Sequence, residues 1–123
     1  ILGKHSVTAA QAAECAGEQG KFWEYHDRLF VSQGALAFTQ GRLKGYAREL
    51  GLENSVFSQC LDSGKYFKKV DGETAIAAFL GARGTPAFFL NGQLIAGAQP
   101  FEVFEAAIEK ELKKASASGE TKP

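Results

Sequence analysis

Residues 84–92 place a Gly-Thr-Pro turn directly before four apolar residues and an Asn-Gly pair. Residues 87–90 are apolar at every position, which is typical of a β-strand covered on both faces. Asn91-Gly92 predicts a two-residue hairpin turn, because both central positions of the favoured turn require positive φ. We therefore expect residues 93–96 to return as the second strand of a hairpin.

Most of the remaining sequence predicts helices. Thr39 suits an N-cap, Gly51 suits a C-terminal stop, and Asn54 is expected to cap a short helix. The last helix is expected to begin near Pro100, with acidic residues near its start and lysines near its end, as the helix dipole favours. The expected helical segments are residues 5–16, 21–30, 40–50, 55–61, 65–80 and 101–114.

Helical spacing also predicts which side chains face the interior. In the longest internal helix, Val70, Ala77 and Leu80 are expected to point inward, and Gly72 is a weak point. The aromatic residues of the second helix are most simply interpreted as core, with a hydrophobic surface as the alternative for a minority of them: Phe22, Trp23, Tyr25 and Phe30. The apolar residues of the last helix share one face: Phe101, Phe104, Ile108 and Leu112.

The predicted hairpin is incomplete as a sheet. A single hairpin is marginal alone, yet its first strand has the composition of a central strand. An apolar strand with an open edge invites pairing with another chain. We therefore expect the sheet to be completed by sequence upstream, by a separate fragment, or by a second copy that pairs through residues 87–90.

Composition limits the class of protein. The 123 residues fit one domain, and 14 basic and 14 acidic side chains cancel. This balance argues against nucleic acid as a partner, and no run approaches the ~20 apolar residues of a membrane span. No signal segment opens the chain, so we expect a mature or truncated product. Two cysteines and two histidines lack zinc-ligand spacing, and no metal or other cofactor is expected.

Several blocks resemble DsbA-like thioredoxin-fold proteins, the bacterial thiol:disulfide oxidoreductases. The stretches AAECAGEQGKFWEYHDRLF, LKGYARELGL and FSQCLDSGKY resemble the helical insertion of that family, and GTPAFFLNG and LIAGAQP resemble its C-terminal part. The match runs from about Ala9 to Leu112. The resemblance implies an incomplete thioredoxin-like α/β fold, with the helical insertion in residues 1–83, the C-terminal half of the thioredoxin fold in 84–114, and a disordered tail in 115–123.

The resemblance implies a role for the loop before the first strand. In the family, the Thr-Pro of this block carries a cis peptide bond beside the active-site disulfide, and Thr85 and Pro86 match it. Together with Gly84 they would contact the substrate. Taken alone, the tripeptide favours an ordinary trans turn. The family's nucleophile lies in a CxxC motif that precedes the helical insertion, so no residue here is expected to be catalytic.

Cys15 and Cys60 lie in blocks that look like packing partners within the family's insertion. We favour a structural disulfide, which would close a loop of about 45 residues, over two buried reduced thiols or a reactive redox pair. Neither cysteine has the electropositive helix-start context of a reactive thiolate. His5 and His26 are expected to be ordinary core or surface residues.

Two functions remain open. The first is the C-terminal part of a DsbA-like oxidoreductase whose Thr85-Pro86 loop positions unfolded or cysteine-containing proteins, the chain itself being inactive. The second is a non-catalytic peptide-binding or dimerisation module of the same fold. The resemblance and the expected disulfide indicate an extracytoplasmic, bacterial setting.

Overall fold

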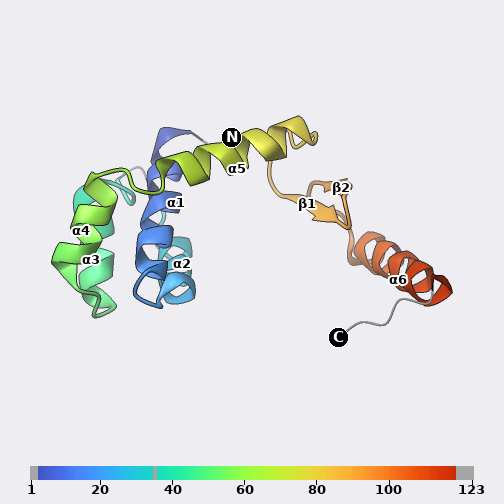
Figure 1. The fold of residues 1–123 in the computed structure, drawn as a ribbon, viewed down its shortest axis with the longest axis horizontal. Helices are drawn as coiled ribbons and strands as arrows, with labels where there is room; N and C mark the ends of the chain where they lie inside the picture. Colours follow the sequence, from blue (N-terminus) through green and yellow to red (C-terminus); the bar gives the residue numbers. More distant parts are fainter. Residues whose placement is uncertain (1–2, 35, 119–123) are drawn as a thin grey trace. The chain divides into compact units, whose positions relative to one another are not determined.

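The computed structural model describes residues 3–34 and 36–118 (Figure 1). The chain divides into two compact units, Ile1–Ala75 and Ile76–Pro123. This division lies within a helix, whereas the sequence analysis placed the boundary between the insertion and the C-terminal half after residue 83.

The first unit is a group of packed helices. Its elements are α1 (Lys4–Gly17), α2 (Phe22–Phe30), α3 (Gln40–Glu49) and α4 (Asn54–Asp62), and α5 (Phe67–Phe79) begins in it. Helix α1 packs against α2, α3 and α4, and α3 packs against both α2 and α4. The pairs α1–α2 and α3–α4 can be followed in Figure 1.

Small residues on α1 allow the other helices to approach closely. The side chains of Ala12 and Ala16 are fully buried, and Ala9 and Ala13 are nearly so. The largest fully buried side chains of the neighbouring helices are Tyr25, Leu43 and Phe57. The rings of Tyr25 and Phe57 have centroids 5.5 Å apart. An alanine-rich face therefore packs against larger residues from α2, α3 and α4, which is how close-packed interiors are filled.

The predicted helix boundaries are largely confirmed. Thr39 is the N-cap of α3, and its hydroxyl oxygen accepts a hydrogen bond from the N–H of Arg42. Gly51 has φ of 75° just beyond the end of α3. Asn54 is the first residue of α4 and Glu53 is the cap. The prediction for Asn54 is therefore wrong by one residue. The reason lies in Gln19, whose amide group hydrogen-bonds both the N–H and the C=O of Glu53.

The prediction that the aromatic residues of α2 form core is wrong for two of the four. Tyr25 is fully buried, but Trp23 is 67% exposed and Phe30 is 69% exposed. Helix α2 turns one face, with Tyr25 and Leu29, toward the core. Trp23 and Phe30 lie outside that face, and Phe22 is half-buried at its edge.

The predicted inward face of α5 is also wrong. The helix spans Phe67–Phe79, and none of its described residues is buried. Val70 and Ala77 are half-buried, and Leu80, just after the helix, is exposed. The division between the units falls within this helix, and among the described residues none of the three is buried.

The second unit is a hairpin followed by a helix. Strand β1 (Ala87–Leu90) pairs antiparallel with β2 (Gln93–Ala96), and Leu90 lies opposite Gln93. Asn91 and Gly92 have φ of 48° and 86°, which confirms the predicted turn. In the described part of the chain the sheet has these two strands, so Phe88 and Phe89 are exposed. Within these residues the expected cover on both faces of β1 is therefore missing.

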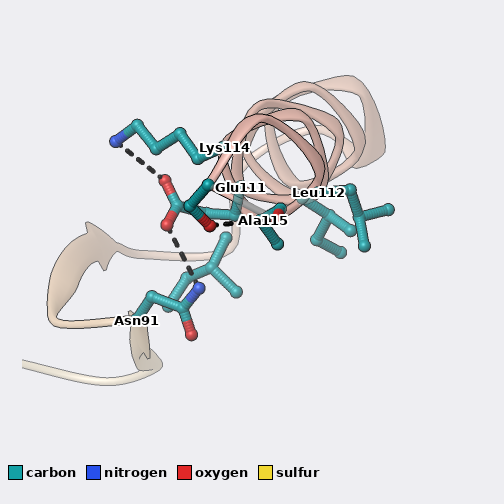
Figure 2. A pocket seen from close by; sticks show the side chains of 8 residues that line it. Asn91, Glu111, Leu112, Lys114 and Ala115 are labelled. Carbon is teal, nitrogen blue, oxygen red and sulfur yellow. Dashed lines mark hydrogen bonds and ion pairs between the residues drawn. The ribbon is translucent and has the colours of Figure 1, made fainter. Parts of the chain in front are cut away.

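Helix α6 (Phe101–Ala117) follows the hairpin. Phe104 packs edge-to-face against Phe88, with ring centroids 4.9 Å apart. At the other end of the hairpin, the Asn91 side-chain amide donates a 3.1 Å hydrogen bond to Glu111 (Figure 2). The helix extends three residues past the predicted end at Lys114, because Ala115, Ser116 and Ala117 can all continue a helix. The rest of the predicted tail, residues 119–123, lies outside the described residues.

Candidate functional site

The Thr85–Pro86 peptide bond is cis. Gly84, Thr85 and Pro86 are all exposed, between the end of α5 and the start of β1. The chain leaves α5 through Gly81, whose φ is 107°. A Cβ atom at Gly81 would lie 3.4 Å from Leu94 Cδ2, so a glycine allows this turn to sit closely against β2.

Hydrogen bonds hold the Gly84-Thr85-Pro86 loop at the end of the hairpin opposite the Asn91-Gly92 turn. The N–H of Gly97 donates a 2.8 Å hydrogen bond to the C=O of Pro86. Gly97 has φ of 85°, and the Gln99 side-chain amide donates a 2.7 Å hydrogen bond to the C=O of Ala96. The turn after β2 therefore fixes the start of β1.

This pairing determines where the main-chain groups of the loop point. Positions in an antiparallel pair alternate between hydrogen-bonded and non-hydrogen-bonded. Because Pro86 and Gly97 are hydrogen-bonded, Ala87 opposite Ala96 is not, and the N–H and C=O of Ala87 point away from β2. Within residues 3–34 and 36–118, neither main-chain group of Thr85 has a hydrogen-bond partner. Thr85 and Ala87 therefore leave polar main-chain groups along the open edge of β1.

A hollow of about 320 Å³ lies at this loop. Small apolar groups form most of its lining, and Arg83 is the charged residue among the described lining residues. The sequence analysis missed the lining residues outside the Gly-Thr-Pro turn. The register could have indicated some of them, because an Asn91-Gly92 turn pairs Leu90 with Gln93 and so brings Gly97 opposite Pro86. The lining residues are Gly81, Ala82, Arg83, Gly84, Thr85, Pro86, Ala87, Leu94, Ala96 and Gly97.

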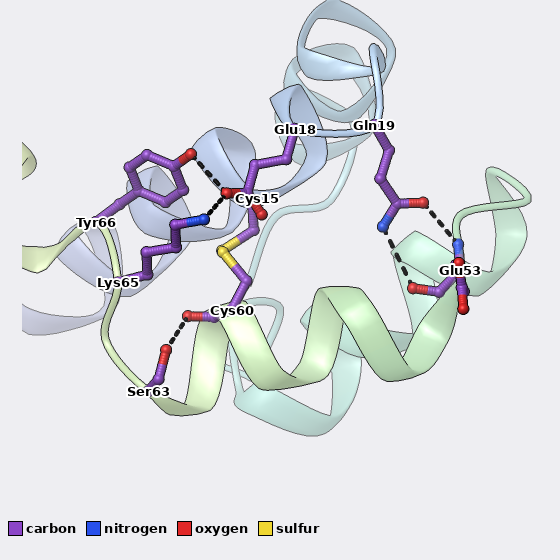
Figure 3. Close-up of a disulfide and its surroundings, with 8 residues drawn as sticks. All are labelled: Cys15, Glu18, Gln19, Glu53, Cys60, Ser63, Lys65 and Tyr66. Atoms are coloured by element: carbon purple, nitrogen blue, oxygen red, sulfur yellow. Dashed lines mark hydrogen bonds and ion pairs between the residues drawn. A yellow bond between two sulfur atoms is a disulfide. The ribbon is translucent and has the colours of Figure 1, made fainter.

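Cys15 and Cys60 form a disulfide between α1 and α4, with Cα atoms 5.9 Å apart (Figure 3). Both residues are buried. The structure thus agrees with a disulfide and not with two buried reduced thiols, and the burial of both cysteines favours a structural bridge over a reactive redox pair. These are the two cysteines of the 123 residues, so neither is available here as a free nucleophile.

A polar cluster lies beside the disulfide. The carboxylate of Glu18 accepts hydrogen bonds from the ammonium group of Lys65 and, at 2.9 Å, from the hydroxyl group of Tyr66. The bonds from Lys65 and then Tyr66 lower the pKa of Glu18. The same contacts raise the pKa of Lys65 and of Tyr66. The cluster ties the segment after α4 to the end of α1.

The two histidines lie in different surroundings. The ring of His26 lies among aromatic rings, with centroids 4.6 Å from Phe30 and 5.1 Å from Trp23. His26 Nδ1 lies 3.1 Å from Asp27 Oδ1, and His5 is exposed. Across the described ranges, no three His, Cys, Asp or Glu residues are grouped so as to hold a metal ion. None of the helices described is long and apolar enough to cross a membrane.

A comparison with protein families decides the classification. The family described as "DSBA-like thioredoxin domain" matches residues 1–109. The chain belongs to this family. The DsbA-like domain has a thioredoxin-like fold, here with six helices and a two-stranded antiparallel sheet in its described residues. Membership points to an oxidoreductase-type function.

Known proteins similar to this DsbA-like domain include a solved structure and proteins named as Na(+)/H(+) antiporters. It resembles a thioredoxin-like oxidoreductase from Silicibacter pomeroyi DSS-3 with a TM-score of 0.76 and 28% identity, over 92% of this chain and 64% of that one. It is 38% identical over 105 residues to a protein named Na(+)/H(+) antiporter NhaA from Herminiimonas arsenicoxydans, which is 85% of this chain and 17% of that protein. NhaA 1 of Salinispora arenicola is 36% identical over 85% of this chain and 16% of that protein. The chain thus spans about one sixth of the length of these antiporters and less than two thirds of the solved oxidoreductase.

Proposed function

We propose that this chain is the substrate-docking part of a DsbA-like protein thiol:disulfide oxidoreductase, and that its Thr85-Pro86 loop binds an extended, cysteine-containing peptide. The observation that carries the proposal is that the two main-chain groups of Thr85, at the start of an open strand edge, have no hydrogen-bond partner among the described residues. An extended peptide adds to such an edge through main-chain hydrogen bonds, and a nearby hollow then selects among side chains. The hollow beside Thr85 offers small apolar groups and the guanidinium group of Arg83.

The chemical step needs a thiolate that this chain does not supply. Disulfide exchange begins when a thiolate attacks one sulfur of a disulfide. Cys15 and Cys60 are joined to each other and buried. We therefore assign docking to these residues and the attack to a cysteine outside them. A buried disulfide also supports an extracytoplasmic location, because oxidising compartments preserve such bonds.

The similarity to the NhaA relatives does not imply that this chain takes part in ion antiport. The match to them covers about one sixth of their length, and the family to which the chain belongs is that of DSBA-like thioredoxin domains. The similarity instead supports a DsbA-like domain as a shared part of these proteins.

Peptide binding tests the proposal. A fluorescent, unstructured peptide with serine in place of cysteine is titrated with the chain, and binding is followed by anisotropy and by amide chemical shifts. We expect shifts at Thr85 and Ala87, and at least tenfold weaker binding when the peptide amides that face the edge are N-methylated. Thr85→Ala, which keeps the main chain, should bind nearly as well as the parent. Equal affinity for methylated and unmethylated peptides would overturn the proposal.

A turnover assay examines the assignment of the nucleophile. The chain with its disulfide intact is expected to give no catalysis of disulfide exchange in a model substrate above the uncatalysed rate. Catalysis that disappears in a Cys15→Ala/Cys60→Ala variant would show that the nucleophile lies within these residues and would refute the assignment.

A second candidate, a dimerisation module, is favoured by the exposed Phe88 and Phe89 on the same strand. Two copies would pair their β1 edges. Analytical ultracentrifugation decides this, because a dimer that Phe89→Lys converts to monomer would favour it over peptide docking.

A further inference from the structure

A second hollow lies in the first unit, between the end of α2 and the start of α3. It has a volume of about 370 Å³ and combines two arginines with hydroxyl and amide groups. It shares no lining residue with the hollow at the Thr85 loop. The described lining residues include no acidic side chain: Arg28, Val31, Ser32, Gln33, Gly34, Leu36, Ala37, Arg42 and Tyr46.

The guanidinium group of Arg28 is held in a fixed position. Its Nε donates a 2.7 Å hydrogen bond to Glu49, and its Nη2 donates a longer one to the other oxygen of that carboxylate. Its Nη1 donates to the hydroxyl oxygen of Ser32, and its plane lies 4.3 Å from the ring centroid of Tyr46. An arginine has five N–H donors, so two are left for a ligand. Such a fixed guanidinium is well prepared to bind an oxyanion, because little side-chain entropy is lost.

Arg42 provides the uncompensated charge. No carboxylate lies within ion-pair distance of Arg42 among residues 3–34 and 36–118. The carboxylate of Glu49 already receives hydrogen bonds from Arg28 on both of its oxygens. The hollow therefore carries a net positive charge that no described residue neutralises.

Apolar side chains border these charges. Val31 is 75% exposed and Leu36 is 66% exposed, and both line the hollow. Isolated exposed apolar residues are ordinary, but two such residues in a hollow that two arginines also line form a mixed surface. This surface is complementary to a peptide in which an acidic residue stands next to an apolar one.

We propose that this hollow binds the carboxylate group of an acidic peptide segment, between Arg28 and Arg42, while an apolar neighbour in the peptide contacts Val31 and Leu36. Charge-assisted hydrogen bonds from guanidinium groups supply the affinity for the carboxylate. The proposed site shares no residue with the Thr85 loop, so an experiment can refute one of the two proposals without refuting the other.

The test uses two peptides that differ in one group. A short peptide with one glutamate between leucines and its glutamine counterpart are titrated with the chain at low salt, and amide shifts are recorded. We expect the glutamate peptide to shift Ser32, Arg42 and Tyr46 and to bind at least tenfold more tightly than the glutamine peptide. Affinity should fall as salt rises. Equal binding of the two peptides would overturn the proposal, and so would binding of inorganic phosphate or succinate without binding of the peptide.

Matched variants locate the site. Arg42→Gln should weaken binding of the glutamate peptide at least fivefold without changing the denaturation midpoint, because Arg42 is exposed and its side chain makes no hydrogen bond or ion pair with the described residues. Arg48→Gln removes the same charge from an exposed position of the same helix and should leave binding within twofold. Equal losses in the two variants would indicate a general charge effect and would refute the site.

Discussion

The hydroxyl group of Tyr25 on α2 donates a 2.8 Å hydrogen bond to the main-chain oxygen of Leu43 on α3. Both side chains are fully buried. Burial raises the pKa of Tyr25, because a phenolate in this site would lose its hydration, and the neighbouring Tyr46 adds to the effect. The bond therefore joins two helices of the core through a group that stays neutral.

Removing this hydroxyl group tests its contribution to stability. Tyr25→Phe keeps the ring but leaves the oxygen of Leu43 without this donor, and should lower the free energy of unfolding by about 1 kcal/mol. Urea denaturation followed by circular dichroism measures the change. Tyr66→Phe removes a hydroxyl group near the surface and should have a smaller effect. Equal stability of Tyr25→Phe and the parent would contradict the prediction.

The raised pKa of Tyr25 also predicts that the folded protein loses stability at high pH. In the unfolded chain, tyrosine ionises near pH 10, whereas folded Tyr25 stays neutral at higher pH. The stabilisation is therefore fully present below about pH 10 and is lost as the pH rises toward the folded pKa. Stability measured from pH 9 to 11.5 should fall more steeply in the parent than in Tyr25→Phe. Parallel profiles of stability against pH for the parent and Tyr25→Phe would show that another group causes the loss of stability at high pH.

The disulfide is expected to stabilise the first unit. Cys15 and Cys60 are 45 residues apart, and closing such a loop contributes up to about 4 kcal/mol in the chain-entropy model. Cys15→Ala/Cys60→Ala should lower the free energy of unfolding by up to that amount, which is measured as a lower midpoint of urea denaturation. Because both residues are buried, a disulfide reductant should act slowly on native protein and rapidly in urea. Fast reduction without denaturant would contradict the structural role.

Local signals in the sequence were sufficient where one residue determines the backbone. Thr39, Gly51 and the Asn91-Gly92 turn lie where the sequence predicts them, because capping and positive φ depend on the residue itself. The incomplete thioredoxin-like fold also agrees with the sequence, although that expectation depended on a resemblance and not on periodicity.

Contacts between distant segments could not be predicted in the same way. The aromatic residues of α2 were predicted together as core, because the sequence alone could not tell that Tyr25 would be covered and Trp23 exposed. The pairing of Cys15 with Cys60 stayed one of several alternatives. The hollow lined by Arg28 and Arg42 gave no sequence signal, because these residues are 14 positions apart and line one hollow only when α2 packs against α3.

The hairpin turn offers a test of backbone conformation. Gly92 has φ of 86°, and nothing lies within 4 Å of a Cβ atom built on it, so Gly92→Ala introduces strain without a collision. A positive φ costs an L-residue roughly 1–2 kcal/mol. Amide exchange at the paired residues Phe88 and Ile95 should therefore become at least about fivefold faster, since 1.4 kcal/mol is a factor of ten. The control Gly72→Ala, in a helix interior with open space, should instead stabilise α5. Unchanged exchange in Gly92→Ala would contradict the strain.

The cluster beside the disulfide predicts how the protein responds to acid. Hydrogen bonds from Lys65 and then Tyr66 lower the pKa of Glu18 below that of an unfolded glutamate. A lowered carboxyl pKa means that the stabilisation is present above about pH 4.3 and is lost as the pH falls through the folded pKa. Glu18→Gln should flatten the dependence of stability on pH below about 4.3, because it removes the carboxyl group whose pKa the folded state lowers. A carbon-detected titration that gives Glu18 the pKa of an unfolded glutamate would refute the prediction, and would mean that Lys65 and Tyr66 do not hold the end of α1 in solution.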